Sequence, residues 1–141
     1  MTNILNIIIP GKPVAKQRAR KGPIGWYNPQ GKEMQKTKRI ICSQLPEGFK
    51  MIPKRIPVKV SIIWFFEPTK AERTKKFLDL IKNEDLPYTK KPDRDNLDKY
   101  ILDCFSGLIF FDDNQVCGCE IMNKYYTDKN SRTEVQIKWQ S

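Results

Sequence analysis

The sequence predicts one α+β domain with two layers, in which a mixed β-sheet of about four strands is packed by two to three helices. Two observations support this fold class. Stretches in which apolar residues alternate, as they do in strands, occur near both ends and in the middle of the chain. Between these stretches, apolar residues recur at helical spacing. A length of 141 residues matches a single domain, so we assign residues 1–141 to one unit.

The first half of the chain contains two predicted strands and one predicted helix. Residues 3–9, NILNIII, predict the first strand, and the following PGKP has the composition of a turn. Residues 14–32 are rich in glycine, proline and cations, and we expect them to form a mobile basic loop. Helical spacing predicts a helix over 31–45, and strict alternation predicts a strand over 57–66.

The second half predicts two helices followed by two strands. An amphipathic helix is expected over 70–82, and a second one from Asp95 or Asn96 to about residue 106, with Gly107 closing it. A strand is expected over 116–126 after the turn FDDN. The second helix has an apolar stripe made of Leu97, Ile101, Cys104, Phe105 and Leu108. The last strand of the chain is expected around Val135, Ile137 and Trp139, which share one face.

Charge is divided unevenly along this basic chain, whose net charge is +10. Residues 1–66 hold thirteen basic and two acidic residues, whereas residues 67–141 hold thirteen basic and fourteen acidic ones. The asymmetry predicts that one region holds a polyanion and the other acts on it. The alternative is a basic protein whose charges are simply solvated.

The chain has no histidine, which excludes schemes that need imidazole as a base, nucleophile or metal ligand. Its four cysteines form no CxxC pair, so we expect reduced thiols and no zinc site. No apolar run approaches ~18 residues, and the first residues do not have the pattern of a signal peptide. We therefore expect a cytoplasmic protein with neither a membrane partner nor a nucleotide cofactor.

The most informative stretch is KPDRDNLDKYILD, residues 91–103. Asp93 and Asp95 are two residues apart and, in the extended segment that Pro92 favours, their side chains emerge on one side. Part of this pattern has a purely structural explanation, because Asp95 can cap the helix and Asp98 favours its dipole. That explanation leaves out Asp93 and the second acidic pair, Asp112-Asp113.

Chain geometry allows the two acidic groups to meet. A helix over residues 96–106 is about 16 Å long, and the six residues 108–113 can span roughly 20 Å. The chain can therefore return Asp112 or Asp113 to the start of the helix. Asp103 lies about 12 Å along the helix from Asp95, so we expect it to pair with Lys99 instead.

Converging carboxylates repel one another unless a cation lies among them. A donor set of oxygens favours Mg²⁺, or Mn²⁺, over Zn²⁺. On a phosphodiester, such an ion would activate water and stabilise the leaving group. Lys99, one turn after Asp95, could neutralise charge on the phosphate or could form only a weak surface ion pair.

The same residues resemble a known family. KPDRDNLDKYILDCFSGLIFFDDNQV is similar to the RusA family of Holliday junction resolvases, whose signature is a DxDNLxK helix start followed by a DD-x-Q-V turn and strand. PGKPVAKQRAR resembles the opening of many phage and prophage members. The resemblance is dense over residues 90–126, which we take as the catalytic core segment. Pro92 stands where some relatives have a basic residue.

The resemblance implies a Mg²⁺-dependent homodimer that nicks opposed strands of a four-way DNA junction. It assigns catalytic carboxylates to Asp93, Asp95 and Asp113, with Asp112 as an additional candidate ligand, and the essential lysine to Lys99. A two-fold dimer suits a two-fold substrate. Cations expected to bind DNA phosphates are Lys12, Lys16, Arg18, Arg20, Lys21, Lys90 and Lys91.

Two alternatives stay open at this point. One is a non-catalytic DNA-binding protein that has kept the fold, and the other is a nuclease for other branched DNA such as flaps or forks. Trp26 and Tyr27, inside the basic segment, could stack on unpaired bases at the crossover or could pack against the domain.

Overall fold

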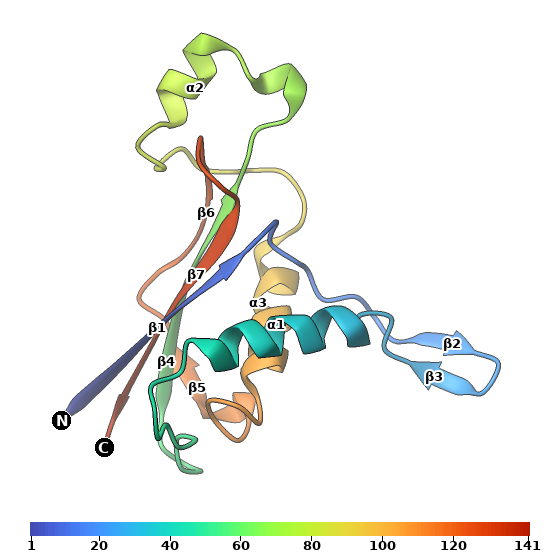
Figure 1. The fold of residues 1–141 in the computed structure, drawn as a ribbon, viewed down its shortest axis with the longest axis vertical. Helices are drawn as coiled ribbons and strands as arrows, with labels where there is room; N and C mark the ends of the chain where they lie inside the picture. The colour runs from blue at the N-terminus through green and yellow to red at the C-terminus, as the bar shows by residue number, and fades with distance from the viewer.

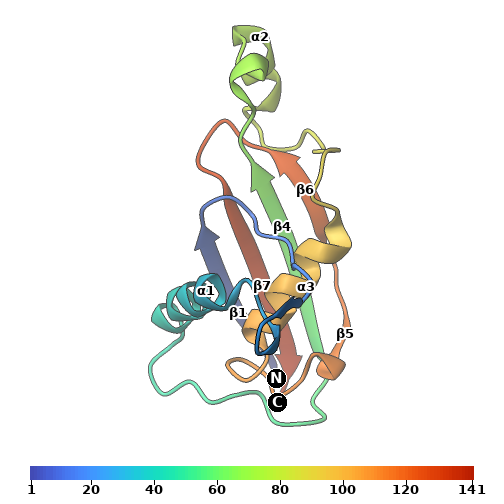
Figure 2. The ribbon, with the colours of Figure 1, turned by 90° about the vertical axis from the view of Figure 1, so that its right-hand side faces the viewer.

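The computed structural model describes residues 1–141 and has a five-stranded mixed sheet with two helices against one of its faces (Figures 1 and 2). The strands are β1 (Thr2–Pro10), β4 (Val58–Phe66), β5 (Val116–Gly118), β6 (Met122–Tyr126) and β7 (Arg132–Gln140). The helices are α1 (Gly31–Ser43), α2 (Lys75–Ile81) and α3 (Arg94–Phe105).

The strand order is β1-β7-β4, with β5 and β6 following one another along the free edge of β4. β7 is antiparallel to β1 and β4, whereas β5 and β6 are parallel to β4. Helices α1 and α3 cover one face of the sheet, and α2 extends beyond its end (Figure 2). This is the predicted two-layer α+β arrangement.

β1 shows why the alternating segments were predictable. Leu5, Ile7 and Ile9 are buried beneath the helices, while Ile4 and Ile8 face outward and are about half exposed. Burying each large aliphatic side chain is worth roughly 1.5–3 kcal/mol, which fixes the side of the strand that faces the core.

The core lies between β4 and the two covering helices. Val58, Val60, Ile62 and Trp64 of β4 are almost fully buried, and the indole N–H of Trp64 has no hydrogen-bond partner. The other side of the core is built from the apolar faces of the helices, with Met34 and Ile41 from α1 and Leu97, Tyr100, Ile101, Cys104 and Phe105 from α3.

The segment expected to be a basic loop, residues 14–32, contains a β-hairpin instead. Its strands β2 (Arg20–Gly22) and β3 (Gly25–Tyr27) pair antiparallel and project from the domain (Figure 1). Both strands are three residues long and mostly exposed, and they consist of cations, glycines and aromatic residues, with no alternation of apolar residues. Periodicity therefore gave no sign of them.

Two other predicted elements are divided. The helix expected over 70–82 is a 3₁₀ turn, Lys70–Glu72, followed by α2, because Thr69 and Thr74 each cap a new start. The strand expected over 116–126 separates into β5 and β6. Between them, the hydroxyl of Ser61 on β4 accepts backbone N–H groups from Glu120 and Ile121, which replaces strand pairing locally.

No helix in this structure combines the length and the apolar composition needed to cross a bilayer.

The loop after α2 is held to the β6–β7 turn by Glu84. Its carboxylate accepts a hydrogen bond from the hydroxyl of Thr127 at 2.6 Å and pairs with the guanidinium of Arg132 at 2.8 Å. These contacts, that with Arg132 foremost, lower the pKa of Glu84 from its ordinary 4.5 to about 2. Arg132 also lies over the ring of Phe65, with its guanidinium carbon 4.0 Å from the centroid.

We predict that Glu84→Gln destabilises the fold in a pH-dependent way. Because folding lowers this pKa, the carboxylate stabilises the native state fully above pH 4.5 and loses that effect as the pH falls toward 2. The variant should lose about 2 kcal/mol of unfolding free energy at pH 7 and much less near pH 2, measured by urea denaturation. Exposed Glu47→Gln is the control, and an equal loss at both pH values would contradict the prediction.

Candidate active site

The start of α3 places two acidic side chains at the surface. Asp93 caps the helix, because its carboxylate accepts the backbone N–H of Asn96 at 3.1 Å. The expectation that Asp95 could be the cap is wrong by two residues, because the helix begins at Arg94. Asp95 lies in the first turn with an exposed side chain. Capping therefore accounts for Asp93 and leaves the carboxylate of Asp95 free of backbone contacts.

Lys99 pairs with Asp95, not with Asp103. Its ammonium lies 3.3 Å from the Asp95 carboxylate, one turn back along the exposed face of α3. Asp103 is instead 2.8 Å from the ammonium of Lys16, whose backbone N–H also donates to the carbonyl of Asn96 at 2.9 Å. The predicted pair of Lys99 and Asp103 is replaced because the segment before the hairpin crosses α3 and brings Lys16 closer.

The second acidic pair forms a tight turn after Phe111. Asp112 accepts the backbone N–H of Asn114 at 3.1 Å and caps a 3₁₀ turn, Asp113–Gln115. That backbone bond lowers the pKa of Asp112, while a hydrogen bond with Asp112 raises the pKa of Asp113. The two shifts in opposite directions are those expected for neighbouring acids.

The chain does turn back along α3, but only part of the way. Asp113 lines a cavity of about 450 Å³ together with Asp98 and Leu102, which lie near the middle of the helix. No three carboxylates or thiols of this chain lie close enough together to hold a metal ion. The predicted meeting of Asp112 or Asp113 with Asp93 and Asp95 is therefore absent within a single chain.

Asp98 occupies the space between the two acidic groups. The sequence analysis gave it only a role at the helix start, yet its side chain is half-buried and faces the same cavity as Asp113. Burial and the charge of Asp95 raise the pKa of Asp98. The sequence does contain a signal for this position of Asp98, because the spacing of Asp95, Asp98 and Leu102 places them on one face of a helix.

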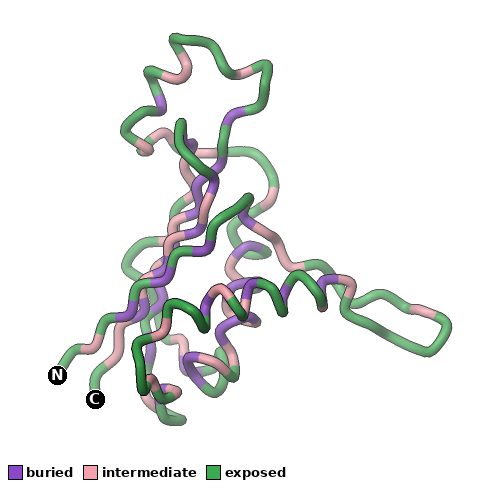
Figure 3. The backbone as a smooth tube through the Cα atoms, in the orientation of Figure 1, coloured by how far each residue is buried: buried purple, intermediate pink, exposed green.

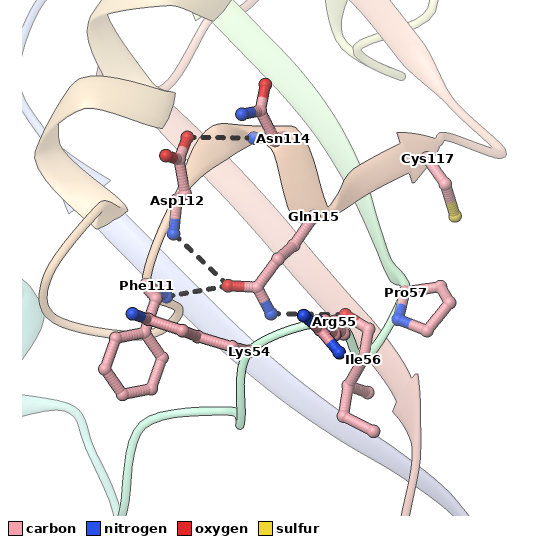
Figure 4. A pocket seen from close by; sticks show the side chains of 9 residues that line it. All are labelled: Lys54, Arg55, Ile56, Pro57, Phe111, Asp112, Asn114, Gln115 and Cys117. Atoms are coloured by element: carbon pink, nitrogen blue, oxygen red, sulfur yellow. Dashed lines mark hydrogen bonds between the residues drawn. The ribbon is translucent and has the colours of Figure 1, made fainter.

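A larger cavity, of about 710 Å³, opens beside Asp112 on the other side of this turn (Figure 4). Lys54 and Arg55 line it and form no ion pair, and the Lys54 ammonium lies 5.4 Å from the ring centroid of half-exposed Phe111. Sequence reasoning missed both cations, whose only signal was their place in the basic half of the chain.

Gln115 forms the wall between this cavity and the acidic turn. Its amide nitrogen donates to the carbonyls of Pro53 and Ile56 at 2.9 and 3.2 Å. Its amide oxygen accepts the backbone N–H groups of Phe111 and Asp112 at 2.9 and 3.2 Å (Figure 4). This side chain fixes the acidic turn against residues 53–56.

The approach to Asp93 is held by Lys124 of β6, which sequence reasoning also missed. Its ammonium donates to the carbonyls of Lys90 and Pro92, both at 2.6 Å. Burial lowers the pKa of Lys124, but the two carbonyls and the nearby Asp93 favour the charged form. Lys124 therefore positions the backbone that leads into α3.

The cations expected to bind phosphates fall into two groups. Lys16 is paired with Asp103 and Lys90 with Glu72, the latter at 2.9 Å. Ion pairs are absent for the remaining five, Lys12, Arg18, Arg20, Lys21 and Lys91. Arg20 and Lys21 lie on β2, Lys12 and Arg18 precede it, and Lys91 precedes α3, so these cations are available to an anion.

Comparison with protein-family models gives a match over residues 10–138 to the family described as Endodeoxyribonuclease RusA. The match covers both acidic groups, the hairpin and all the strands except β1, of which it includes only Pro10, and the last two residues of β7. No curated protein matches the chain.

We predict that Lys124→Met loosens the start of α3. The carbonyls of Lys90 and Pro92 lose their charged donor, which should cost about 1–3 kcal/mol of unfolding free energy. Amide hydrogen exchange at Asn96, whose N–H is held by Asp93, should become faster. Lys59→Met, at an exposed and unpaired lysine of β4, is the control. Unchanged exchange at Asn96 would show that Lys124 does not position this segment.

Proposed function

This chain belongs to the RusA family of endodeoxyribonucleases, and we propose that it resolves four-way DNA junctions by paired, divalent-metal-dependent nicks. The family indicates endodeoxyribonuclease activity on Holliday junctions. The observation that carries the proposal for this chain is the family match together with the exposed aspartates of α3. Asp95 is paired only with the exposed Lys99, on the surface of a protein of net charge +10.

The candidate ligands suit a hard divalent cation by their chemistry, although no three of them lie close enough together in this chain to hold one. All the candidate ligands are carboxylates, and neighbouring carboxylates repel one another unless a cation lies among them. Oxygen donors of this kind suit Mg²⁺ or Mn²⁺. Asp93, Asp95 and Asp113 would hold the ion, with Asp112 as a further candidate. When bound, it would supply an activated water and neutralise charge on the phosphodiester.

Lys99 would neutralise the phosphate that is cut. The side chains of Lys99 and Asp95 are both exposed, and ion pairs between exposed side chains contribute little to the stability of the fold. The ammonium can therefore leave Asp95 for a phosphate oxygen without disturbing the fold. A charged donor aimed at the phosphate stabilises the transition state most strongly when water is excluded by the bound DNA.

DNA would be held by the cations that have no partner in the protein. Arg18, Arg20 and Lys21 lie on or next to the hairpin, and Lys12 and Lys91 lie near its base and near the start of α3. Lys54 and Arg55, around the larger cavity, extend the same surface to the side of Asp112. We assign Lys16 and Lys90 mainly to positioning, because both are engaged in ion pairs.

We further propose that the active form is a homodimer. A four-way junction has approximate two-fold symmetry, so two copies related by a two-fold axis would present one site to each of two opposed strands. Paired nicks at symmetric positions follow from that arrangement.

The first test uses a labelled synthetic four-way junction with wild type, Asp95→Asn and exposed Asp85→Asn as a control. Wild type and control should make symmetric nicks near the crossover in Mg²⁺ and none in EDTA. Asp95→Asn should cut at least about 100-fold more slowly while binding the junction normally.

Two outcomes would favour the alternatives. Tight binding without cutting by wild type, in Mn²⁺ as well as Mg²⁺, would point to a non-catalytic DNA-binding protein. Faster cutting of flaps or forks than of four-way junctions would point to a nuclease for other branched DNA.

We also predict that Arg20→Ala weakens junction binding at every salt concentration. It should reduce the slope of log K against log salt by about one, because one phosphate contact is lost. Lys90→Ala is a matched control, since the lysine is paired with Glu72, and its slope should stay close to that of wild type. Equal slopes for wild type and Arg20→Ala, from titrations at several salt concentrations, would remove Arg20 from the DNA-binding surface.

A further inference from the structure

The hairpin of β2 and β3 ends in an apolar tip that the domain does not cover. Figures 1 and 3 show the hairpin projecting from the domain with almost all of its backbone exposed. Ile24, in the turn, is fully exposed, and Trp26 just after it is 72 % exposed. Large apolar side chains left in water at the end of an arm are unfavourable unless something else covers them.

The arm is built to keep its shape. Gln30 is buried at its base, where its amide oxygen accepts the N–H of Gln17 at 2.8 Å and its amide nitrogen donates to the carbonyl of Ala15 at 2.7 Å. Near the tip, a side chain on Gly22 would bring its Cβ to 3.2 Å from the ring of Tyr27, so this ring lies directly on the glycine. Tyr27 is thereby used within the hairpin, and Trp26 is the aromatic side chain left free.

The base of the arm is attached to the catalytic helix. Lys16 donates its backbone N–H to the carbonyl of Asn96, and its ammonium binds Asp103 further along α3. Both contacts are to the helix that carries Asp95 and Lys99. The base of the arm is therefore anchored to the helix whose residues would engage the phosphate.

The surroundings of the tip identify the chemistry of its partner. Residues 10–32 contain six cations and no acid: Lys12, Lys16, Arg18, Arg20, Lys21 and Lys32. A polyanion that also offers flat apolar surface fits this combination, and stacked bases on a phosphate backbone are such a partner. Attachment to α3 favours the DNA being cut over an unrelated ligand.

We propose that the hairpin is a wedge for the branch point of the junction. Ile24 enters between the base pairs that meet at the crossover, and Trp26 stacks on a base that this insertion exposes. Apolar side chains that enter base steps unstack and bend DNA in this way. This inference rests on the proposed function, and it assigns to Ile24 and Trp26 the opening of the junction, not its cutting.

The test places the fluorescent base 2-aminopurine beside the crossover and uses the Asp95→Asn protein, so that no cutting is needed. Binding should raise the fluorescence severalfold as the base unstacks. Adding Ile24→Ser should remove most of this rise in fluorescence, and adding Trp26→Ser should reduce it. Neither change should alter the affinity for the junction more than about threefold, because the cations that bind phosphates remain. Adding Leu80→Ser, at an apolar residue of α2 that is 59 % exposed, should change nothing.

A second measurement uses cutting. In the otherwise wild-type enzyme, Ile24→Ser should slow resolution of a fully paired junction about 10-fold. It should slow resolution of a junction with mismatched bases at the crossover less than about twofold, because those bases are already unpaired. A variant that had merely lost its fold would be slow on both substrates.

Several results would overturn the wedge. A full fluorescence rise with Ile24→Ser would do so, even if the enzyme resolves junctions as proposed. A change from dimer to monomer in sedimentation, with Ile24→Ser and not Leu80→Ser, would make the tip a contact between copies of the chain. Failure of wild type to cut despite a normal, Ile24-dependent rise would instead remove the nuclease proposal and keep the wedge.

Discussion

The packing of α3 against β4 is the constraint on which the rest of this molecule depends. Leu97, Ile101 and Phe105 are buried against the sheet, so their side of the helix cannot turn toward solvent. The opposite side must then carry Asp95 and Lys99 at the surface. Loss of this contact would remove much of the core and the acidic face in one step, because both are sides of a helix of twelve residues.

Acidic side chains are used in two different ways in the two ends of the molecule. Around α2 and the β6–β7 turn, Glu67, Glu72 and Glu84 are each hydrogen-bonded and paired with a cation, and their pKa values are lowered. Along α3 and the following turn, Asp98 and Asp113 have raised pKa values and no cation of their own. The first group stabilises the fold, whereas the second is left without an ion-pair partner in the chain.

Periodicity predicted the elements whose burial repeats along the chain. β1, β4, α1 and α3 were found within one or two residues of their bounds at most ends, because one side of each is buried. The hairpin at residues 20–27 was missed because neither of its sides is buried. The split of residues 116–126 was missed because it depends on the hydroxyl of Ser61, which lies in another strand.

The candidate site was predictable in composition and not in arrangement. The types and spacing of Asp93, Asp95 and Lys99 were visible in one stretch, and the ion pair of Asp95 with Lys99 follows from helical spacing. The partner of Asp103 was not visible, since Lys16 is far away in sequence and is brought near by the path of the hairpin. Lys124 and Gln115 were missed for the same reason, because their partners are backbone carbonyls of distant segments.

The double attachment of Lys16 to α3 has a consequence for exchanging parts between relatives. A hairpin moved into another member of the family would keep its own pairing and its Gln30 brace, since these are internal to the segment. Its direction would be inherited only if the recipient offered a carboxylate at the position of Asp103. The unit that can be transferred is therefore the hairpin together with Asp103, almost ninety positions after Lys16. In a chimaera that exchanges the hairpin alone, the ion pair that orients it would be lost.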